Sequence, residues 1–130
     1  MAKKINRGLF LNDNNMKSIF LYLCKYSGLF LLSKYLLRKK LLILCYHGFE
    51  INNESQFRPQ LFIKKDTFER RLKVIKKSSS VVIPLDDAVR SLETDSLPDS
   101  SVVITIDDGF YSVLSIAFPL LRKYGYPATL

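Results

Sequence analysis

Three short and continuous apolar runs, each bounded by polar residues, do most to limit the folds open to this chain. They cover residues 41–46 (LLILCY), 81–84 (VVIP) and 101–106 (SVVITI). Runs of this length without polar alternation are typical of strands that are buried on both faces of a parallel sheet. Parallel neighbours need long crossover connections, so the pattern predicts an α/β fold in which helices cover the sheet.

Two helices are predicted between these strands. The first covers residues 66–77, where Asp66 can cap the N-terminus with Glu69 three residues on. The second opens at Asp86 or Asp87. The apolar residues expected to face the sheet are Phe68, Leu72 and Ile75 in the first helix and Leu85, Ala88, Val89 and Leu92 in the second.

A third helix is predicted over residues 112–124, followed by the entry to a fourth strand at 127–130. Pro119 fits poorly in a helix interior, so we expect a bend, or an irregular first turn with the regular helix starting near Phe118. Gly125 is a natural stop. A chain that stops as a strand begins would leave a sheet edge uncovered, so we expect these 130 residues to be part of a larger domain.

The charge of the chain is concentrated in residues 1–40. The net charge is +8, but residues 1–40 hold nine Lys and Arg against one Asp, while residues 41–130 hold eleven basic and eleven acidic residues. A nucleic-acid binder more often carries its charge on the folded recognition surface, so we expect no nucleic acid as a partner. We interpret 1–40 as a basic, hydrophobic helical segment and 41–130 as a separate neutral domain.

The apolar stretch 16–37 leaves three interpretations open: helices packed on the following domain, attachment to an anionic membrane surface, or an uncleaved anchor. Its length matches a membrane span, but Lys25 and Lys34 interrupt it, and Ser27-Gly28 is expected to divide it into two helices. No small-residue cleavage site follows it. This favours a cytoplasmic or membrane-associated protein.

Two cysteines and one histidine limit the chemistry that the chain can perform by itself. Cys24 and Cys45 lie in apolar runs without C-x-x-C spacing, which excludes a zinc finger, a disulfide scaffold and a thioredoxin-type motif and predicts buried thiols. His47 follows the first predicted strand, where it could contact substrate or metal, or simply bond to the backbone.

Asp107-Asp108-Gly109 follows the third predicted strand, at the edge where α/β proteins bind ligands. One carboxylate could ligate a metal while its neighbour accepts a proton from water. Alternatively, one Asp caps the next helix and the other is solvated. Adjacent acidic residues alone do not separate these two interpretations.

The sequence from Ser101 to Phe110 (SVVITIDDGF) and the later YGYPAT closely resemble the polysaccharide deacetylase family, the NodB-homology domain of carbohydrate esterase family 4. The first motif of the family is T-[FY]-D-D-G, and this chain has Ile106 in the aromatic position. The upstream ILCYHGF also resembles a branch of the family whose first strand ends in Tyr-His. The resemblance runs from about residue 41 to the last residue.

The resemblance implies an incomplete (β/α) barrel, preceded here by N-terminal helices, and hydrolysis of N-acetyl groups on the amino sugars of a polysaccharide. It implies Asp107 as catalytic base, Asp108 as ligand to a divalent metal, commonly zinc, and His47 near the barrel mouth. The second motif, H-[ST]-x-x-[HD], brings two further ligands, and nothing in the 130 residues matches it. We therefore expect the N-terminal part of a deacetylase domain, inactive by itself. The alternative is a non-catalytic membrane-surface or partner-binding protein that uses residues 1–40.

Overall fold

The computed structural model describes residues 13–130, and its contacts separate a unit that ends at Leu36 from a unit that covers Leu37–Leu130. The first unit contains α1 (Asp13–Tyr26) and most of α2 (Leu29–Leu37). The break between the two helices is at Gly28, whose φ of +77° is in the left-handed region that glycine adopts without strain. The predicted division at Ser27-Gly28 is confirmed.

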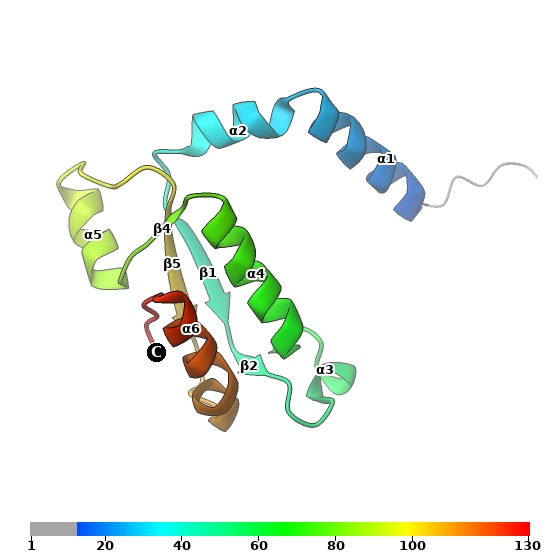
Figure 1. The fold of residues 1–130 in the computed structure, drawn as a ribbon, viewed down its shortest axis with the longest axis vertical. Helices are drawn as coiled ribbons and strands as arrows, with labels where there is room; N and C mark the ends of the chain where they lie inside the picture. The colour runs from blue at the N-terminus through cyan, green and yellow to red at the C-terminus, as the bar shows by residue number, and fades with distance from the viewer. Residues whose placement is uncertain (1–12) are drawn as a thin grey trace, which may run out of the picture. The chain divides into compact units, whose positions relative to one another are not determined.

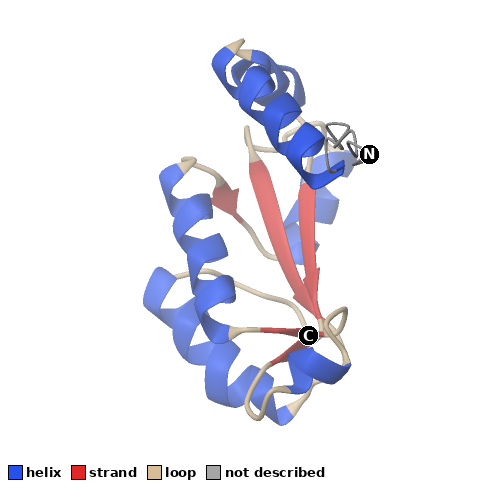
Figure 2. Cartoon of the chain, turned by 90° about the vertical axis from the view of Figure 1, so that its right-hand side faces the viewer, coloured by secondary structure: helices blue, strands red, loops and turns tan. Residues whose placement is uncertain are grey.

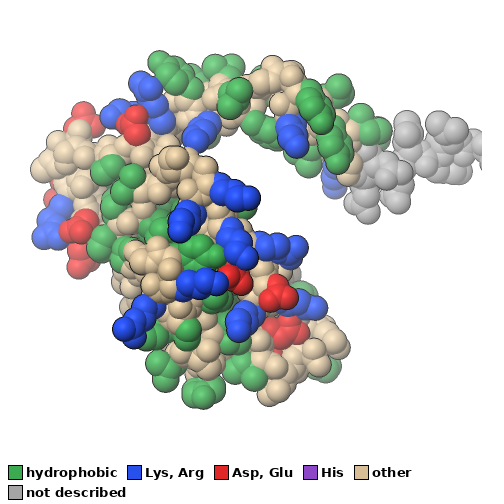
Figure 3. Space-filling model, in the orientation of Figure 1, with side chains coloured by type: hydrophobic (Ala, Val, Ile, Leu, Met, Phe, Trp, Pro, Cys, Tyr) green, Lys and Arg blue, Asp and Glu red, His purple; other side chains and the backbone are tan. Residues whose placement is uncertain are grey.

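Large apolar side chains are exposed along α1 and α2, while Cys24 is buried as predicted. Within the described residues no single helix has the length and apolar character to span a membrane; Met16–Tyr26 and Leu29–Leu37 meet that test only as a pair, bent by 73°. Figure 3 shows the apolar side chains of this unit on the viewed face. The exposed residues are Met16, Ile19, Phe20, Leu21, Tyr22, Leu23, Tyr26, Leu29, Phe30, Leu31, Leu32, Tyr35 and Leu36.

The second unit is built on a parallel sheet of three strands in the order β1-β5-β4. These strands are β1 (Leu42–Tyr46), β5 (Ser101–Ile106) and β4 (Val81–Val82). A second parallel pair, which the sequence did not predict, joins β2 (Gly48–Phe49) to β3 (Phe62–Ile63). The expected fourth strand is reduced to a parallel bridge between Thr129 and Thr105. The predicted parallel α/β architecture is therefore confirmed.

Helices α4 and α6 lie side by side over one face of β1 and β5 (Figures 1 and 2). The helices of this unit are α3 (Glu54–Phe57), α4 (Lys65–Lys77), α5 (Leu85–Glu93), a π-helical turn η1 (Val113–Ala117) and α6 (Phe118–Tyr124). The predicted apolar face of α4 is confirmed, since Phe68, Leu72 and Ile75 are buried in the core that these elements share. In α5 only Ala88 is buried, whereas Val89 and Leu92 are exposed.

The predicted helix caps are wrong. The N-cap of α4 is Lys64 and that of α5 is Pro84, and neither makes a side-chain cap hydrogen bond. Each helix begins before the expected aspartate, so Asp66, like Asp86 and Asp87, lies in a first turn, where a negative charge favours the helix dipole without capping it.

Pro119 has the effect that the sequence predicts. The turn η1 is π-helical and regular α-helix starts at Phe118. Pro119 lacks the N–H that an interior residue would donate, and the irregular turn directly before it accommodates that loss. Gly125 ends α6 in the left-handed conformation, with φ of +67°. Both expectations for this helix are confirmed.

Burial of β1 on both faces is not observed. Strand β5 is buried almost throughout, but β1 exposes about half of Leu42 (53%) and Ile43 (51%), and Cys45 is also exposed. Tyr46 points into the core beneath the helices, so Cys45, one residue before it, projects from the opposite face. The prediction of a buried Cys45 thiol is therefore wrong, because α4 and α6 cover only one face of this strand.

Glu69 joins α4 to α6 through one carboxylate oxygen. Its Oε1 accepts hydrogen bonds from Lys123 Nζ at 2.8 Å and from Tyr124 Oη at 3.3 Å, and Lys73 Nζ lies 3.5 Å away. The hydrogen bond from Lys123 lowers the pKa of Glu69 below its ordinary 4.5. A depressed carboxyl pKa stabilises the fold above pH 4.5 and loses that effect as the pH falls through the folded-state value.

We expect Glu69→Gln to lower the melting temperature by about 1–4 °C at pH 7, because an exposed ion pair is a weak interaction. The difference from the wild type should shrink as the pH falls below 4.5 and the wild-type carboxylate becomes protonated. Glu93→Gln, on the exposed end of α5, is the matched control. If Glu69→Gln lowers the melting temperature by the same amount at every pH, the ion-pair explanation is contradicted.

Candidate functional site

The functional candidates lie where β1 and β5 end at the same edge of the sheet (Figure 1). The register pairs Cys45 with Thr105 and Tyr46 with Ile106. One step further, the backbone N–H of Asp107 donates to the carbonyl of Tyr46 at 2.8 Å. The main chain therefore places Asp107 beside the end of β1, with His47 directly after the strand.

Three side chains from this edge converge. Cys45 Sγ donates to Asp107 Oδ2 at 3.5 Å, and His47 Nε2 lies 3.8 Å from the same oxygen. Cys45 and His47 are two residues apart on an extended segment, so their side chains project from the same face. The ligand atoms of the three residues all lie within 4.8 Å of one another. We call this group the Cys45-His47-Asp107 triad.

Asp108 is outside the triad. Its φ of +67°, followed by +51° at Gly109, turns the chain sharply after β5, and its side chain is exposed. The alternative in which an aspartate caps the next helix is wrong, because the N-cap of η1 is Ser112 and makes no side-chain cap hydrogen bond. The structure thus brings Asp107 and His47 together and leaves Asp108 on the adjoining turn.

Buried contacts hold the two loops of the site in place. A side chain at Gly48 would overlap the ring of Phe62, so glycine is required directly after His47. The Phe62 ring in turn lies 5.3 Å from the ring of Phe110, on the turn that follows Asp108. The backbone N–H of Phe49 also donates to the buried hydroxyl of Ser112 at 3.0 Å. These contacts fix the loop of His47 against the loop of both aspartates.

A cavity of about 160 Å³ adjoins the triad. Cys45, Tyr46 and His47 line one side of it, and residues 59–63 with Arg71 line the other. Water and small solutes can therefore reach Cys45 and His47 from this side.

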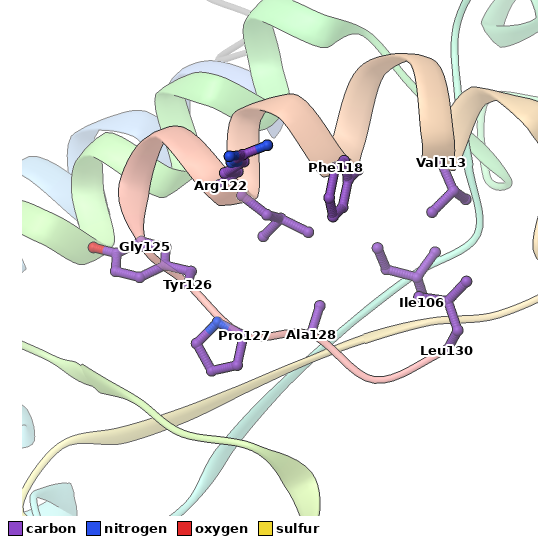
Figure 4. A pocket seen from close by; sticks show the side chains of 10 residues that line it. Ile106, Val113, Phe118, Arg122, Gly125, Tyr126, Pro127, Ala128 and Leu130 are labelled. Atoms are coloured by element: carbon purple, nitrogen blue, oxygen red, sulfur yellow. The ribbon is translucent and has the colours of Figure 1, made fainter.

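A larger cavity of about 490 Å³ lies between the last helix and the end of the chain. Figure 4 shows Val113 and Phe118 facing Ile106 and Ala128 across it. Its lining is mostly apolar and includes no carboxylate or imidazole side chain, so it offers no usual metal ligand, and Arg122 and Tyr126 are its only polar side chains. We therefore place the chemistry at the triad and not in the larger cavity.

Comparison with known proteins shows which proteins the chain resembles. No family model matches the sequence. The Bacillus subtilis protein YxkH, named as a polysaccharide deacetylase, is 33% identical over 92 residues, which are 70% of this chain and 31% of the relative. The solved structure of the Streptococcus pyogenes deacetylase PplD in complex with acetate matches 68% of this chain and 40% of its own, with a TM-score of 0.62 and 27% identity. The chain matches part of a polysaccharide deacetylase domain.

The structure of IcaB from Ammonifex degensii gives the same result, with a TM-score of 0.59, 28% identity and 68% of this chain matched to 36% of that one. The fold is an incomplete (β/α) barrel of the NodB type, as the resemblance implied. The chain spans about a third of the curated relative. We refer to residues 41–130, which contain the sequence motifs that resemble the family, as the deacetylase segment.

The sequence alone did not single out Cys45 as a site residue. Its position in an apolar run indicated a buried thiol, yet Cys45 lies two residues before His47 at the carboxyl end of a strand. That spacing was the available signal, because alternate residues of a strand share a face. Which face of β1 is exposed to solvent depends on which face α4 and α6 cover, and the sequence pattern does not show this.

Proposed function

We propose that the deacetylase segment supplies the proton-accepting half of a metal-dependent hydrolysis that removes N-acetyl groups from a polysaccharide. The observation that carries the proposal is the position of Asp107, held by main-chain bonds at the open edge of the sheet beside His47. The relatives named as deacetylases, matched over about two thirds of this chain, support the substrate class.

In this proposal Asp107 is the general base and accepts the proton of the attacking water. Its side chain is about half exposed, so water can reach the carboxylate. His47 is close enough to orient that carboxylate or to contact the sugar, and Asp108, on the adjoining turn, would contribute a metal ligand. Proton transfer of this kind typically contributes roughly 10²–10⁴-fold to a rate.

The donor atoms at this edge suit a divalent ion, with zinc the expected one. Asp108 would supply one carboxylate ligand to that ion, since carboxylates are among the usual zinc ligands. When bound, such an ion would polarise the acetyl carbonyl and stabilise the negative charge that develops on its oxygen. The 130 residues contain one histidine, so they do not hold the two-histidine ligand set of the family motif. We therefore propose that they are inactive alone.

A chimera tests this function. Residues 41–130 replace the matching region of PplD, and acetate release is measured on an N-acetylated glycan that PplD itself deacetylates, with zinc present. We expect acetate release from the chimera and none from the 130 residues alone. A chimera with native-like circular dichroism that releases no acetate, while PplD does, would count against the proposal.

A second role, at an anionic membrane surface, is favoured by the exposed apolar side chains of α1 and α2. In the same segment, Lys17, Lys25 and Lys34 carry positive charge. Apolar side chains that enter the lipid interface next to basic ones that meet anionic headgroups are the usual elements of such binding.

We expect the full chain to sediment with vesicles that contain phosphatidylglycerol more than with neutral ones. Replacing Phe20 and Leu31, which are 65% and 76% exposed, by serine should weaken partitioning by at least about tenfold. The matched control replaces Phe57 and Leu114 by serine, since both are exposed in the other unit. Equal partitioning of the two double variants would remove this role.

A further inference from the structure

We propose that the Cys45-His47-Asp107 triad is a metal site in its own right, for zinc or another thiophilic divalent ion, and that it is separate from the ligand role given to Asp108. The proposal rests on the geometry of the triad and does not depend on deacetylase activity.

The distances within the triad match those between ligands around one tetrahedral zinc ion. Zinc bonds of about 2.3 Å to sulfur and about 2.0–2.1 Å to nitrogen and oxygen place sulfur and oxygen ligands about 3.5 Å apart, and nitrogen and oxygen ligands about 3.3 Å apart. The corresponding separations here are 3.5 Å from Cys45 Sγ to Asp107 Oδ2 and 3.8 Å from His47 Nε2 to the same oxygen. A shift of about half an ångström in the His47 ring would complete the geometry.

The main chain fixes the positions from which these three side chains project. Cys45 belongs to β1, which pairs with β5 along its full length, and the N–H of Asp107 extends that pairing by one bond to Tyr46. Gly48, packed under Phe62, fixes the chain on the far side of His47. Ligands on paired strands are held more accurately than ligands on loops, so little ordering is needed when an ion binds.

The chemical character of the triad distinguishes it from a purely carboxylate site. A thiolate and an imidazole select zinc and related ions over magnesium and calcium, which prefer oxygen ligands. Binding converts the Cys45 thiol to a thiolate and releases its proton to solvent. The triad supplies three ligands, and the adjoining cavity leaves the ion accessible for water as the fourth.

A metal held by the triad would engage Asp107 Oδ2, the carboxylate that the proposed deacetylation uses as base. The two functions of Asp107 would then exclude each other. Metal binding can be measured without any turnover, so the failure of one proposal leaves the other intact.

Titration of the reduced full chain with Co²⁺ tests the site, because cobalt bound to a thiolate has a charge-transfer band in the near ultraviolet. We expect that band to appear at one equivalent and to disappear when Zn²⁺ is added in competition. Cys45→Ser should abolish it, and Cys24→Ser, which removes the other thiol, should leave it unchanged. His47→Gln and Asp107→Asn should each weaken Co²⁺ binding by at least about a hundredfold.

Asp108→Asn tests whether the bound ion uses the triad or the ligand set expected of the family, which includes Asp108. If the ion uses the triad, this variant should leave the Co²⁺ affinity unchanged. A band that persists in Cys45→Ser, or that is insensitive to both His47→Gln and Asp107→Asn, would overturn the proposal. Loss of Co²⁺ binding in Asp108→Asn would overturn it as well. Cys45 is exposed, so its replacement by serine should not disturb the fold, which circular dichroism checks.

Discussion

Replacing Asp107 by asparagine in the PplD chimera is expected to lower the rate of acetate release by roughly 10²–10⁴-fold. Asparagine keeps the size of the side chain and can still accept a hydrogen bond, but it cannot accept the proton of the attacking water. The backbone bond from residue 107 to Tyr46 is unaffected by the change, so the loop should keep its position. The measurement is kcat for acetate release at the zinc concentration that gives the highest rate.

Asp108→Asn and Asp86→Asn complete this experiment. If Asp108 is a metal ligand, Asp108→Asn should lose activity at low zinc and regain part of it as the zinc concentration rises, whereas Asp107→Asn should not recover. Asp86 is exposed on α5, away from the sheet edge, and its replacement by asparagine should leave kcat unchanged. Full activity of the Asp107→Asn chimera would assign the base to another residue.

Replacing Phe68 by alanine is expected to destabilise the second unit by about 3–5 kcal/mol. The Phe68 side chain is fully buried, and its ring lies 5.0 Å from that of Tyr46 and 4.7 Å from that of Phe49, edge to face in both pairs. Removing the ring leaves a cavity between α4 and the strands that it covers. Urea denaturation of the full chain, followed by circular dichroism, measures the loss.

Phe57→Ala is the matched control, because Phe57 is 83% exposed on α3 and its replacement should change stability by less than about 0.5 kcal/mol. A domain of this size is only marginally stable, so Phe68→Ala could unfold it outright. Phe68→Leu keeps most of the volume and should give a smaller, measurable loss. Equal stability of the Phe68→Ala and Phe57→Ala variants would contradict the assigned core.

The main elements of the fold could be predicted from the sequence because their patterns are local. The apolar runs that became β1 and β5, the buried face of α4 and the irregular turn before Phe118 all follow from neighbouring residues. The short strands β2 and β3 could not be predicted in this way. Their pairing brings Gly48 against the Phe62 ring, where a larger residue would overlap it, and this contact joins two segments that are separated by a loop.

The candidate site, too, could be predicted only where the evidence for it is local in the sequence. Asp107 and His47 were identified from their places after apolar runs, and the structure brings their side chains within 3.8 Å. The exposure of Cys45 depends on which face of β1 the helices cover, and this is decided by tertiary packing. The predicted N-caps were wrong because both helices begin before the expected aspartate, at N-caps that make no side-chain hydrogen bond.

The pairing of β1 with β5 also determines when Cys45 and Asp107 come together during folding. Cys45 and Asp107 are 62 residues apart in the chain, and they meet only after that long loop has closed. An ion held at the proposed metal site would act as a removable cross-link, because it would bind the closed chain and not the open one. The extent of such cross-linking would then depend on the free zinc concentration around the protein, which makes the lifetime of the folded chain a function of metal supply.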